Sequence, residues 1–387
     1  MQYNFDTIID RKGTNTFKWD NMQRMFGRND LLPFWVADMD FPAPPDIQRV
    51  LAERVAHGVY GYTYIPESAY EAVIDWCGVR YGWEVDRDWL LIANGVMPTV
   101  AFAIQAFTSP GDAVIVQPPV YYPFYSVVEK NDRKLISNTL VQNQSGEYGI
   151  NFPELEAQMK DGARLLLFCS PHNPVGRVWT REELFEVGKL CEKYDVYVIS
   201  DEIHADIIFS GRRHLSFGAL PEPYSSRAIV ALAPSKTFNI PGLTVSQVLI
   251  PDKQVRKQFT SYVHRFSMEI KNLFSVIGME SAYRYGGPWL DALLKYLQGN
   301  IDFLQQYLQK HLPEVRLHIP EGTYLVWLDF RGIDPAGCGK RLVEEAMVGL
   351  NDGAVFGEAG RGFQRMNVAC PRMTLEEGLR RMAALFS

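Results

Sequence analysis

The chain has 387 residues, of which 47% are hydrophobic, 13% aromatic and 22% charged. This composition excludes an intrinsically disordered chain, and the length favours two domains or one large domain with a smaller one attached. Lys and Arg number 39 against 45 Asp and Glu, giving a formal net charge of -6. We therefore expect no general attraction to nucleic-acid phosphates or to anionic lipid.

The first residues, Met1 to Gly13, are polar and mixed in charge, without the apolar run of a signal peptide. No stretch approaches the roughly 18 consecutive apolar residues of a membrane-spanning helix, so we expect no membrane partner. The five cysteines are scattered and never spaced as C-x-x-C, which favours neither a disulfide framework nor a zinc site. We expect a cytoplasmic protein without a bound metal.

Between about residues 90 and 250, short apolar runs alternate with polar residues and amphipathic stretches. This alternation is typical of an α/β fold with a mainly parallel sheet whose strands are covered on both faces. Thr180 and Glu183 form a capping-box pattern ahead of an apolar helix face, which predicts the start of a helix. The predicted strands are 113–117, 164–169, 196–200, 229–233 and 247–250.

Beyond Pro251 the apolar spacing predicts long helices over 259–285 and 289–312. The last third of the chain then contains a predicted strand at 324–330 and a glycine-rich stretch at 353–362. A second capping-box pattern at Thr374 and Glu377 predicts where the last helix begins. We expect a large domain over 49–285, with 1–48 and 286–387 forming a smaller α+β domain.

Chemically distinctive residues follow the predicted strands where each strand ends. They are Tyr121 and Tyr122 after the first, Asn173 after the second, Asp201 after the third, and Ser235 and Lys236 after the fourth. Ligands of open α/β sheets bind beyond the carboxyl ends of the strands, so these groups should lie on one rim. A lysine, a carboxylate, an amide and an aromatic ring are the groups that pyridoxal 5'-phosphate needs from a protein.

The phosphate of that cofactor needs backbone donors and the positive end of a helix. Gly95, Val96 and Met97 follow an apolar pair and open an apolar stretch, which predicts a phosphate cup assisted by the hydroxyl of Ser235. Near the end of the chain, Arg365 lies in a strand-like run after the glycine-rich stretch. We expect this arginine to bind a substrate carboxylate in a bidentate manner.

These motifs, in this order, resemble the fold-type I, class I/II aminotransferase family of pyridoxal-phosphate enzymes over essentially the whole chain. Within that family, four segments resemble the MalY/PatB branch of cystathionine β-lyases and carbon-sulfur lyases. They are residues 35–41 (WVADMDF), 60–63 (YGYT), 201–204 (DEIH) and 369–371 (ACP).

The resemblance implies roles for the candidate residues. Lys236 would be the Schiff-base lysine and the base that removes the α-proton, with Asp201 beside the pyridine nitrogen and Asn173 donating to the phenolic oxygen. The other implied contacts are Tyr121 stacked on the ring, His204 near the cofactor, Arg365 with the backbone of Ala37 on the substrate carboxylate, Tyr122 on the substrate, and Tyr62 lent to the phosphate of a neighbouring subunit. The implied protein is a homodimer that cleaves the Cβ–S bond of L-cystathionine or related cysteine S-conjugates, yielding pyruvate, ammonia and a thiol.

Two positions depart from the family pattern. Thr244 stands where many aminotransferases carry an arginine that neutralises the phosphate, so that charge would depend more on helix amides, Ser235 and Tyr62. His204 stands where a tyrosine is often found. Two alternatives stay open: an aminotransferase that uses the same groups, and a lyase with an additional regulatory, protein-binding role. The preferred thiol-side group depends on pocket shape, which sequence patterns do not describe.

Overall fold

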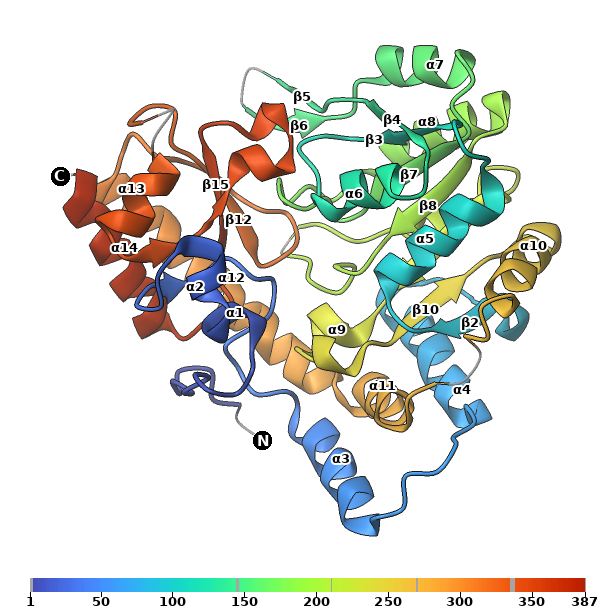
Figure 1. Cartoon of the computed structure of the whole chain (residues 1–387), viewed down its shortest axis with the longest axis horizontal. Helices are drawn as coiled ribbons and strands as arrows, with labels where there is room; N and C mark the ends of the chain where they lie inside the picture. Colours follow the sequence, from blue (N-terminus) through green and yellow to red (C-terminus); the bar gives the residue numbers. More distant parts are fainter. Residues whose placement is uncertain (1–2, 144–145, 210, 269–270, 335–337, 387) are drawn as a thin grey trace.

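The computed structural model describes residues 3–143, 146–209, 211–268, 271–334 and 338–386. Its central strands are β2 (Leu90–Ala93), β3 (Ala113–Val116), β4 (Lys134–Ser137), β7 (Leu165–Cys169), β8 (Tyr197–Asp201), β9 (Ala228–Leu232) and β10 (Ser246–Leu249). Within the described residues they form a seven-stranded sheet in the order β2-β10-β9-β8-β7-β3-β4 (Figure 1). The five predicted strands are confirmed to within one residue at each end.

The sheet is mainly parallel, as predicted, because β4, β3, β7, β8 and β9 all run in one direction. Strand β10, however, is antiparallel to both β9 and β2, so a parallel assignment of 247–250 is wrong. The physical reason lies in the connection after β9. A parallel return needs a crossover connection that passes over a face of the sheet, usually as a full helix. Here the single-turn helix α9 (Pro234–Thr237) and a 3-10 turn (Pro241–Leu243) reverse the chain instead.

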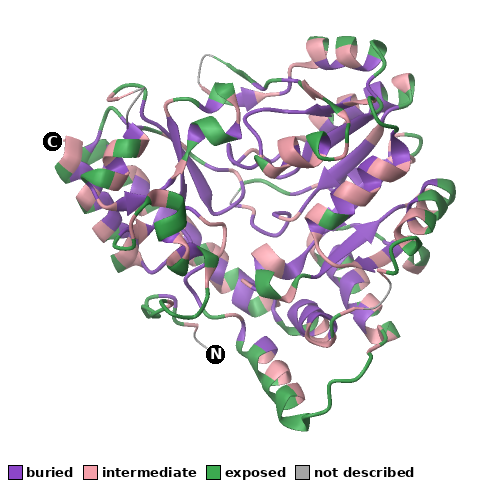
Figure 2. Ribbon diagram, viewed as in Figure 1, coloured by how far each residue is buried: buried purple, intermediate pink, exposed green. Residues whose placement is uncertain are grey.

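Helices cover both faces of the sheet, which explains why the central strands are almost entirely apolar. The covering helices are α5 (Val96–Phe107) and α6 (Pro123–Glu129) on one face, and α7 (Phe152–Lys160) and α8 (Arg181–Tyr194) on the other. Side chains alternate along a strand, so Leu165 and Leu167 of β7 pack in one core cluster while Leu166 and Phe168 pack in the other. Figure 2 shows the middle of the sheet as buried, in agreement with the complete burial of β7, β9 and β10.

The structure shows where the two helices predicted from capping-box patterns begin. At α8 the prediction is confirmed, since the backbone of Glu183 donates to Thr180 Oγ1 at 3.2 Å and the backbone of Thr180 donates to Glu183 Oε2 at 2.8 Å. The last helix, α14 (Arg372–Phe386), begins before Thr374, so this second box is wrong. Backbone bonds from Thr374 and Leu375 to the carbonyl of Pro371 start the helix there, and Glu377 binds Arg380 and Arg381 instead.

The predicted helix over 259–285 is two helices, α10 (Lys253–His264) and α11 (Leu273–Tyr285); residues 269–270 between them lie outside the described residues. The chain leaves the helix at Ser267, whose φ of 52° is left-handed. Asn272 then caps α11 by accepting from the backbone of Phe274 and Ser275. The predicted helix over 289–312 corresponds to α12 (Gly287–His311), which leads into the C-terminal part.

A second sheet lies in the C-terminal part. Its strands are β11 (Arg316–His318), β12 (Leu325–Asp329), β14 (Asn351–Asp352) and β15 (Phe363–Asn367), all antiparallel, and helices α13 (Cys338–Glu344) and α14 pack nearby.

The remaining elements lie outside these two sheets. A small hairpin, β5 (Val141–Gln142) with β6 (Tyr148–Gly149), lies at the edge of the molecule, and α3 (Pro45–His57) and α4 (Glu67–Trp76) pack on α11. None of the helices in the described ranges is long and apolar enough to cross a membrane.

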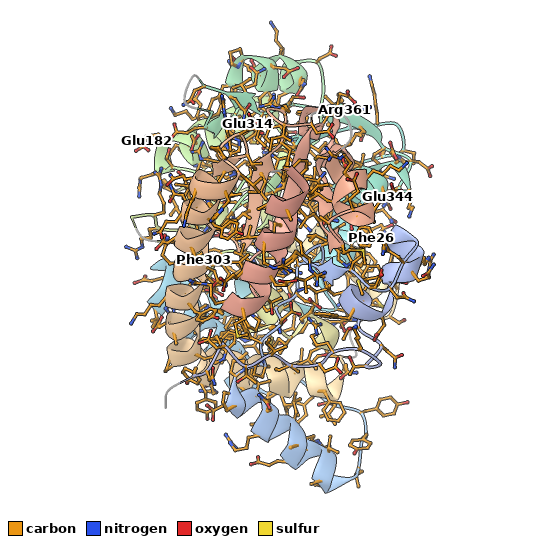
Figure 3. The ribbon with its side chains drawn as sticks, turned by 90° about the vertical axis from the view of Figure 1, so that its left-hand side faces the viewer. Phe26, Glu182, Phe303, Glu314, Glu344 and Arg361 are labelled. Atoms are coloured by element: carbon orange, nitrogen blue, oxygen red, sulfur yellow. The ribbon has the colours of Figure 1, made fainter. Side chains whose placement is uncertain are left out.

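The N-terminal segment packs with this C-terminal part. Strand β1 (Leu32–Pro33) pairs in parallel with β13 (Val348–Gly349). Two short helices, α1 (Phe17–Asp20) and α2 (Met22–Phe26), precede β1, and α2 lies near α13 (Figure 1). Phe26 and Glu344, labelled in Figure 3, mark where α2 meets α13. This pairing supports our proposal that 1–48 and 286–387 form the smaller domain.

Candidate active site

A cavity of about 510 Å³ opens beyond the carboxyl ends of the central strands and is closed on its other side by N- and C-terminal segments. Every predicted site residue except Tyr62 lines it. These residues are Gly95, Val96 and Met97 at the start of α5, Tyr121 and Tyr122 after β3, Asn173 after β7, Asp201 and His204 at and after β8, Ser235 and Lys236 in α9, Ala37, and Arg365 on β15. The structure thus brings together side chains that are up to 328 positions apart, from Ala37 to Arg365.

Lys236 projects from the one-turn helix α9 that follows β9. Its Nζ donates to the carbonyl oxygen of Ala37 at 2.5 Å. Burial lowers the pKa of Lys236 to about 8, with Arg365 lowering it further and the carboxylates of Asp38 and Asp201 opposing the shift. An amine with this pKa is partly neutral near pH 7 to 8, which is the form that a nucleophile or a base requires.

The turn that carries Lys236 is anchored by a buried carboxylate. Thr237 Oγ1 donates to Asp206 Oδ2 at 2.7 Å, while Asp206 Oδ1 accepts from Trp76 Nε1 at 3.0 Å and from the hydroxyl of Tyr81 at 2.8 Å. Burial raises the pKa of Asp206, and these donors oppose the shift. Sequence patterns do not reveal this anchor, because its partners come from distant segments of the chain.

Asp201 is the last residue of β8 and faces the cavity. Burial raises its pKa to about 7, although the backbone of Ile203 donates to Oδ1 at 3.1 Å and the nearby Lys236 favours the charged form. The neighbouring Glu202 is bound elsewhere, by His214 Nε2 at 2.9 Å and by the backbone of Phe217 at 2.8 Å. Of the two adjacent carboxylates, only Asp201 is therefore placed to interact with a ligand.

Arg365 is a buried cation surrounded by neutral acceptors. Its Nη1 donates to Asn173 Oδ1 at 3.0 Å, and its Nη2 donates to the carbonyl of Trp35 at 2.8 Å and to Asn351 Oδ1 at 2.5 Å. Burial lowers its pKa to about 10, and its buried Nε has no hydrogen-bond partner among the described residues. Such a guanidinium favours a carboxylate ligand. The contact with Arg365 also engages the Oδ1 of Asn173, leaving its amide NH2 as the group that can donate.

The wall formed by residues 35–39 is held by asparagines. Asn239 accepts from the backbone of Met39 at 2.9 Å and donates to its carbonyl at 3.0 Å, while Asn367 Nδ2 donates to the carbonyls of Val36 and Asp38 at 2.7 and 2.6 Å. The hydroxyl of Tyr324 donates to the carbonyl of Ala37 at 3.0 Å. Asn367 lies two residues after Arg365 on one strand, so both side chains project from the same face. The spacing of two residues between Arg365 and Asn367 can be read from the sequence, whereas no sequence pattern indicates the role of Tyr324.

The opposite end of the cavity has the features of an anion site. Helix α5 begins at Val96, directly after Gly95, which has a φ of 114°. The amide of Gly95 donates to Ser246 Oγ at 3.2 Å, so the first amides of the helix itself, together with Ser235, are the donors that face a ligand there. Thr244, in the place of the usual arginine, also lines the cavity.

The remaining predicted residues have distinct environments. Burial raises the pKa of Tyr121 to about 12, so its hydroxyl keeps its proton. His204 is buried, its Nδ1 has no hydrogen-bond partner in the part of the chain that the structure describes, and burial lowers the pKa of the ring well below its usual value, which favours the neutral form. Tyr62, by contrast, is 96% exposed in the segment between α3 and α4, which Figure 2 shows as an exposed stretch. The structure does not bring Tyr62 to this chain's own cavity.

Comparison with known proteins confirms the resemblance drawn from the motifs. Residues 31–382 match the family model for aminotransferase class I and II. The chain is 42% identical over 387 residues to cystathionine beta-lyase PatB of Bacillus subtilis (strain 168), covering 99% of this chain and 100% of PatB. It is 34% identical over 386 residues to the protein MalY of Escherichia coli (strain K12), covering 97% of each chain.

Two solved structures have the same fold over their whole length. Cystalysin of Treponema denticola, which contains a pyridoxal 5'-phosphate cofactor, superposes with a TM-score of 0.95 at 35% identity, covering 100% of this chain and 99% of cystalysin. The PLP-bound C-S lyase of Staphylococcus hominis in complex with L-cycloserine gives a TM-score of 0.94 at 32% identity, with the same coverage of 100% and 99%. The chain therefore belongs to the aminotransferase class I and II family, in the branch that contains PatB and MalY.

Proposed function

We propose that the protein is a pyridoxal 5'-phosphate-dependent carbon-sulfur β-lyase that converts L-cystathionine or related cysteine S-conjugates into pyruvate, ammonia and a thiol. The observation that carries this proposal is the placement of the Lys236 amine, the Asp201 carboxylate and the Arg365 guanidinium around one cavity. The names of PatB and of the Staphylococcus hominis C-S lyase support the reaction type. The PLP-bound state of the related structures supports the cofactor.

The cavity fits this cofactor on three grounds. Its volume of about 510 Å³ lies within the range of cofactor sites. Its donor set matches the groups of the cofactor: an amine for the aldehyde, a carboxylate for the pyridine nitrogen, an amide for the phenolic oxygen and a helix start for the phosphate. Finally, the buried His204 Nδ1 and Arg365 Nε lack partners, as expected of groups that face a ligand.

Each residue has a defined task in the proposed reaction. When bound, the cofactor supplies an electron sink that makes the substrate's Cα proton acidic. Asp201 would maintain that sink, because its carboxylate is the group that would face the pyridine nitrogen and favour its protonated form. Arg365 binds the substrate's α-carboxylate, and the rigid 35–39 segment fixes the position of the amino acid beside it.

Proton transfer is assigned to Lys236 and Tyr121. The neutral Nζ of Lys236 takes the proton from Cα, since burial lowers the pKa of this amine to about 8 and so leaves part of it unprotonated near neutral pH. The Cβ–S bond then breaks with its electron pair on sulfur. The hydroxyl of Tyr121, protonated at neutral pH, is a proton source for the departing thiolate. The remaining three-carbon fragment is hydrolysed to pyruvate and ammonia.

A single comparison tests this function. The holoenzyme is incubated with L-cystathionine alone, and pyruvate and free thiol are measured; in parallel it is incubated with an amino acid and a keto acid, and the second amino acid is measured. The proposal expects pyruvate and thiol in equal amounts in the first reaction. Formation of a second amino acid without pyruvate would instead identify an aminotransferase.

We further propose that the protein acts in the cytoplasm as a homodimer in which Tyr62 reaches the partner's cofactor phosphate. The exposure of Tyr62 is shared by the nearby Val59, Tyr60 and Tyr64, which form an apolar surface of the kind that associates with another chain. The five cysteines are all buried and unpaired, as is usual in a reducing compartment.

A further inference from the structure

We propose that Phe17 and Tyr122 form an aromatic mouth to the cavity that selects cysteine S-conjugates with an apolar thiol-side group over those whose thiol side is charged. This inference rests on the proposed lyase function and deepens it by naming the substrate class. It is argued from the two exposed rings, from their links to Arg365 and from the charged residues of the cavity.

Phe17 is 58% exposed although it lines the cavity, and the residues around it are firmly held. Lys18 is fully buried and its Nζ donates to Asp40 Oδ2 at 2.6 Å, while its carbonyl accepts from Trp35 Nε1 at 3.0 Å. The ring of Phe17 packs 5.2 Å from that of Trp35. A large aromatic ring held rigidly in solvent at the edge of a cavity is well suited to contact a ligand, since it loses little conformational freedom on binding.

Tyr122 supplies a second ring to the same cavity and is 41% exposed. It lies 5.6 Å from Tyr121 and meets Phe356 edge-on at 5.9 Å. Phe356 is buried and carries the guanidinium of Arg365 4.9 Å above its face. Phe356 therefore contacts both Tyr122 and Arg365, the residue proposed to bind the substrate carboxylate.

Phe17 has an equivalent link to Arg365. Its neighbour Trp35 accepts a hydrogen bond from Arg365 Nη2 through its carbonyl oxygen at 2.8 Å. Both aromatic residues are thus connected to Arg365 through a single intervening residue, and both retain exposed surface. Asp201 and Arg365 are buried whereas both rings are partly exposed, so the rings lie on the open side of the cavity, where the thiol side of a substrate held by Arg365 would leave the buried groups.

The charged groups of the cavity are already committed to the amino-acid part of the substrate and to the cofactor. Among the described residues that line the cavity, the cationic side chains are Lys236 and Arg365, and the carboxylate is Asp201. The thiol side of L-cystathionine carries an ammonium and a carboxylate, for which the described lining residues of this chain leave no oppositely charged partner. An apolar thiol side instead buries surface against Phe17 and Tyr122, which favours binding.

The test compares kcat/KM for pyruvate release from S-benzyl-L-cysteine, S-methyl-L-cysteine and L-cystathionine. We expect the S-benzyl compound to exceed L-cystathionine by about tenfold or more, as hydrophobic pockets discriminate on that scale. Phe17→Ala should lower kcat/KM for the S-benzyl compound by about tenfold, mainly through KM, and leave S-methyl-L-cysteine unchanged. Tyr122→Ser is a second variant, and it should lower kcat/KM for the S-benzyl compound by a larger factor than for S-methyl-L-cysteine. Met25→Ala is the matched control, because Met25 is 50% exposed on the next helix and does not line the cavity.

The outcomes separate the inference from the function on which it rests. Pyruvate release from L-cystathionine with a kcat/KM equal to or above that of the S-benzyl compound would overturn the aromatic mouth and leave the lyase standing. Equal losses with all three substrates in the Phe17 and Tyr122 variants would show a structural role and also overturn it. Absence of pyruvate from every substrate would overturn the proposed function, and the inference with it.

Discussion

Replacement of Arg365 by alanine is the most informative single change at the site. In the wild-type protein the guanidinium is held by Asn173, Asn351 and the carbonyl of Trp35, all neutral acceptors, so its charge is free for a ligand. Removing it would leave the substrate carboxylate in a buried setting without a partner. That loss typically costs about 2 to 5 kcal/mol. At about 1.4 kcal/mol per factor of ten, kcat/KM should fall by about 30-fold to 4000-fold.

The assay follows pyruvate release over a range of substrate concentrations, with Arg365→Lys as the control. Lysine keeps the charge but cannot form two parallel hydrogen bonds, so it should recover part of the loss. The lower kcat/KM should result chiefly from a higher KM, with kcat little changed, if the carboxylate contact is the same in the ground state and the transition state. Thermal unfolding of each variant separates a binding defect from a folding defect. An Arg365→Ala enzyme that is folded and has unchanged kcat/KM would refute the assignment of the carboxylate site.

Three further predictions concern the lysines. Lys236→Ala should abolish both turnover and covalent trapping of the cofactor by borohydride, measured by the absorbance of the desalted protein; trapping at the wild-type level would contradict the assignment of Lys236. The rate of cofactor attachment to the apoprotein should rise with pH and level off above about 8, because burial lowers the pKa of Lys236 to about 8 and the neutral amine is the reactive form; a rate that keeps climbing to pH 10 would indicate an ordinary lysine. Lys18→Met should lower the free energy of unfolding by about 3 kcal/mol in a denaturant titration, because it removes a partner of the buried Asp40. A loss below about 0.5 kcal/mol would mean that Arg11, which also pairs with Asp40, carries the interaction by itself.

The chemistry of the site was largely predictable because it lies at strand ends. Apolar runs identify the strands, and the residue types that follow them, such as Asp201 and Lys236, stand out against their surroundings. The carboxyl ends of parallel strands meet at one edge, so proximity in space follows from topology alone. For the same reason the antiparallel direction of β10 did not impair the prediction, since Lys236 lies four residues after the end of the parallel strand β9, well before β10 begins.

The supporting contacts were not predictable in this way. Asp206, Tyr324 and Asn239 act through hydrogen bonds to partners far away in sequence, and no local pattern specifies such pairs. The Thr374 prediction failed because a matching pair of residue types does not ensure cap geometry when helical hydrogen bonds can start earlier, at Pro371. The break before α11 was missed because apolar spacing continues across it, although Asn272 offers a capping signal.

The pairing of β1 with β13 has a consequence for how the protein is made. Leu32 can find its partner Val348 only after nearly the whole polypeptide has left the ribosome. Until then the nascent N-terminal segment, with its internal lysine at position 18, has no sheet edge on which to dock. The wall of the cavity that contains Ala37 also depends on contacts with Tyr324 and Asn367, so we expect a chain truncated before these residues to lack a complete site.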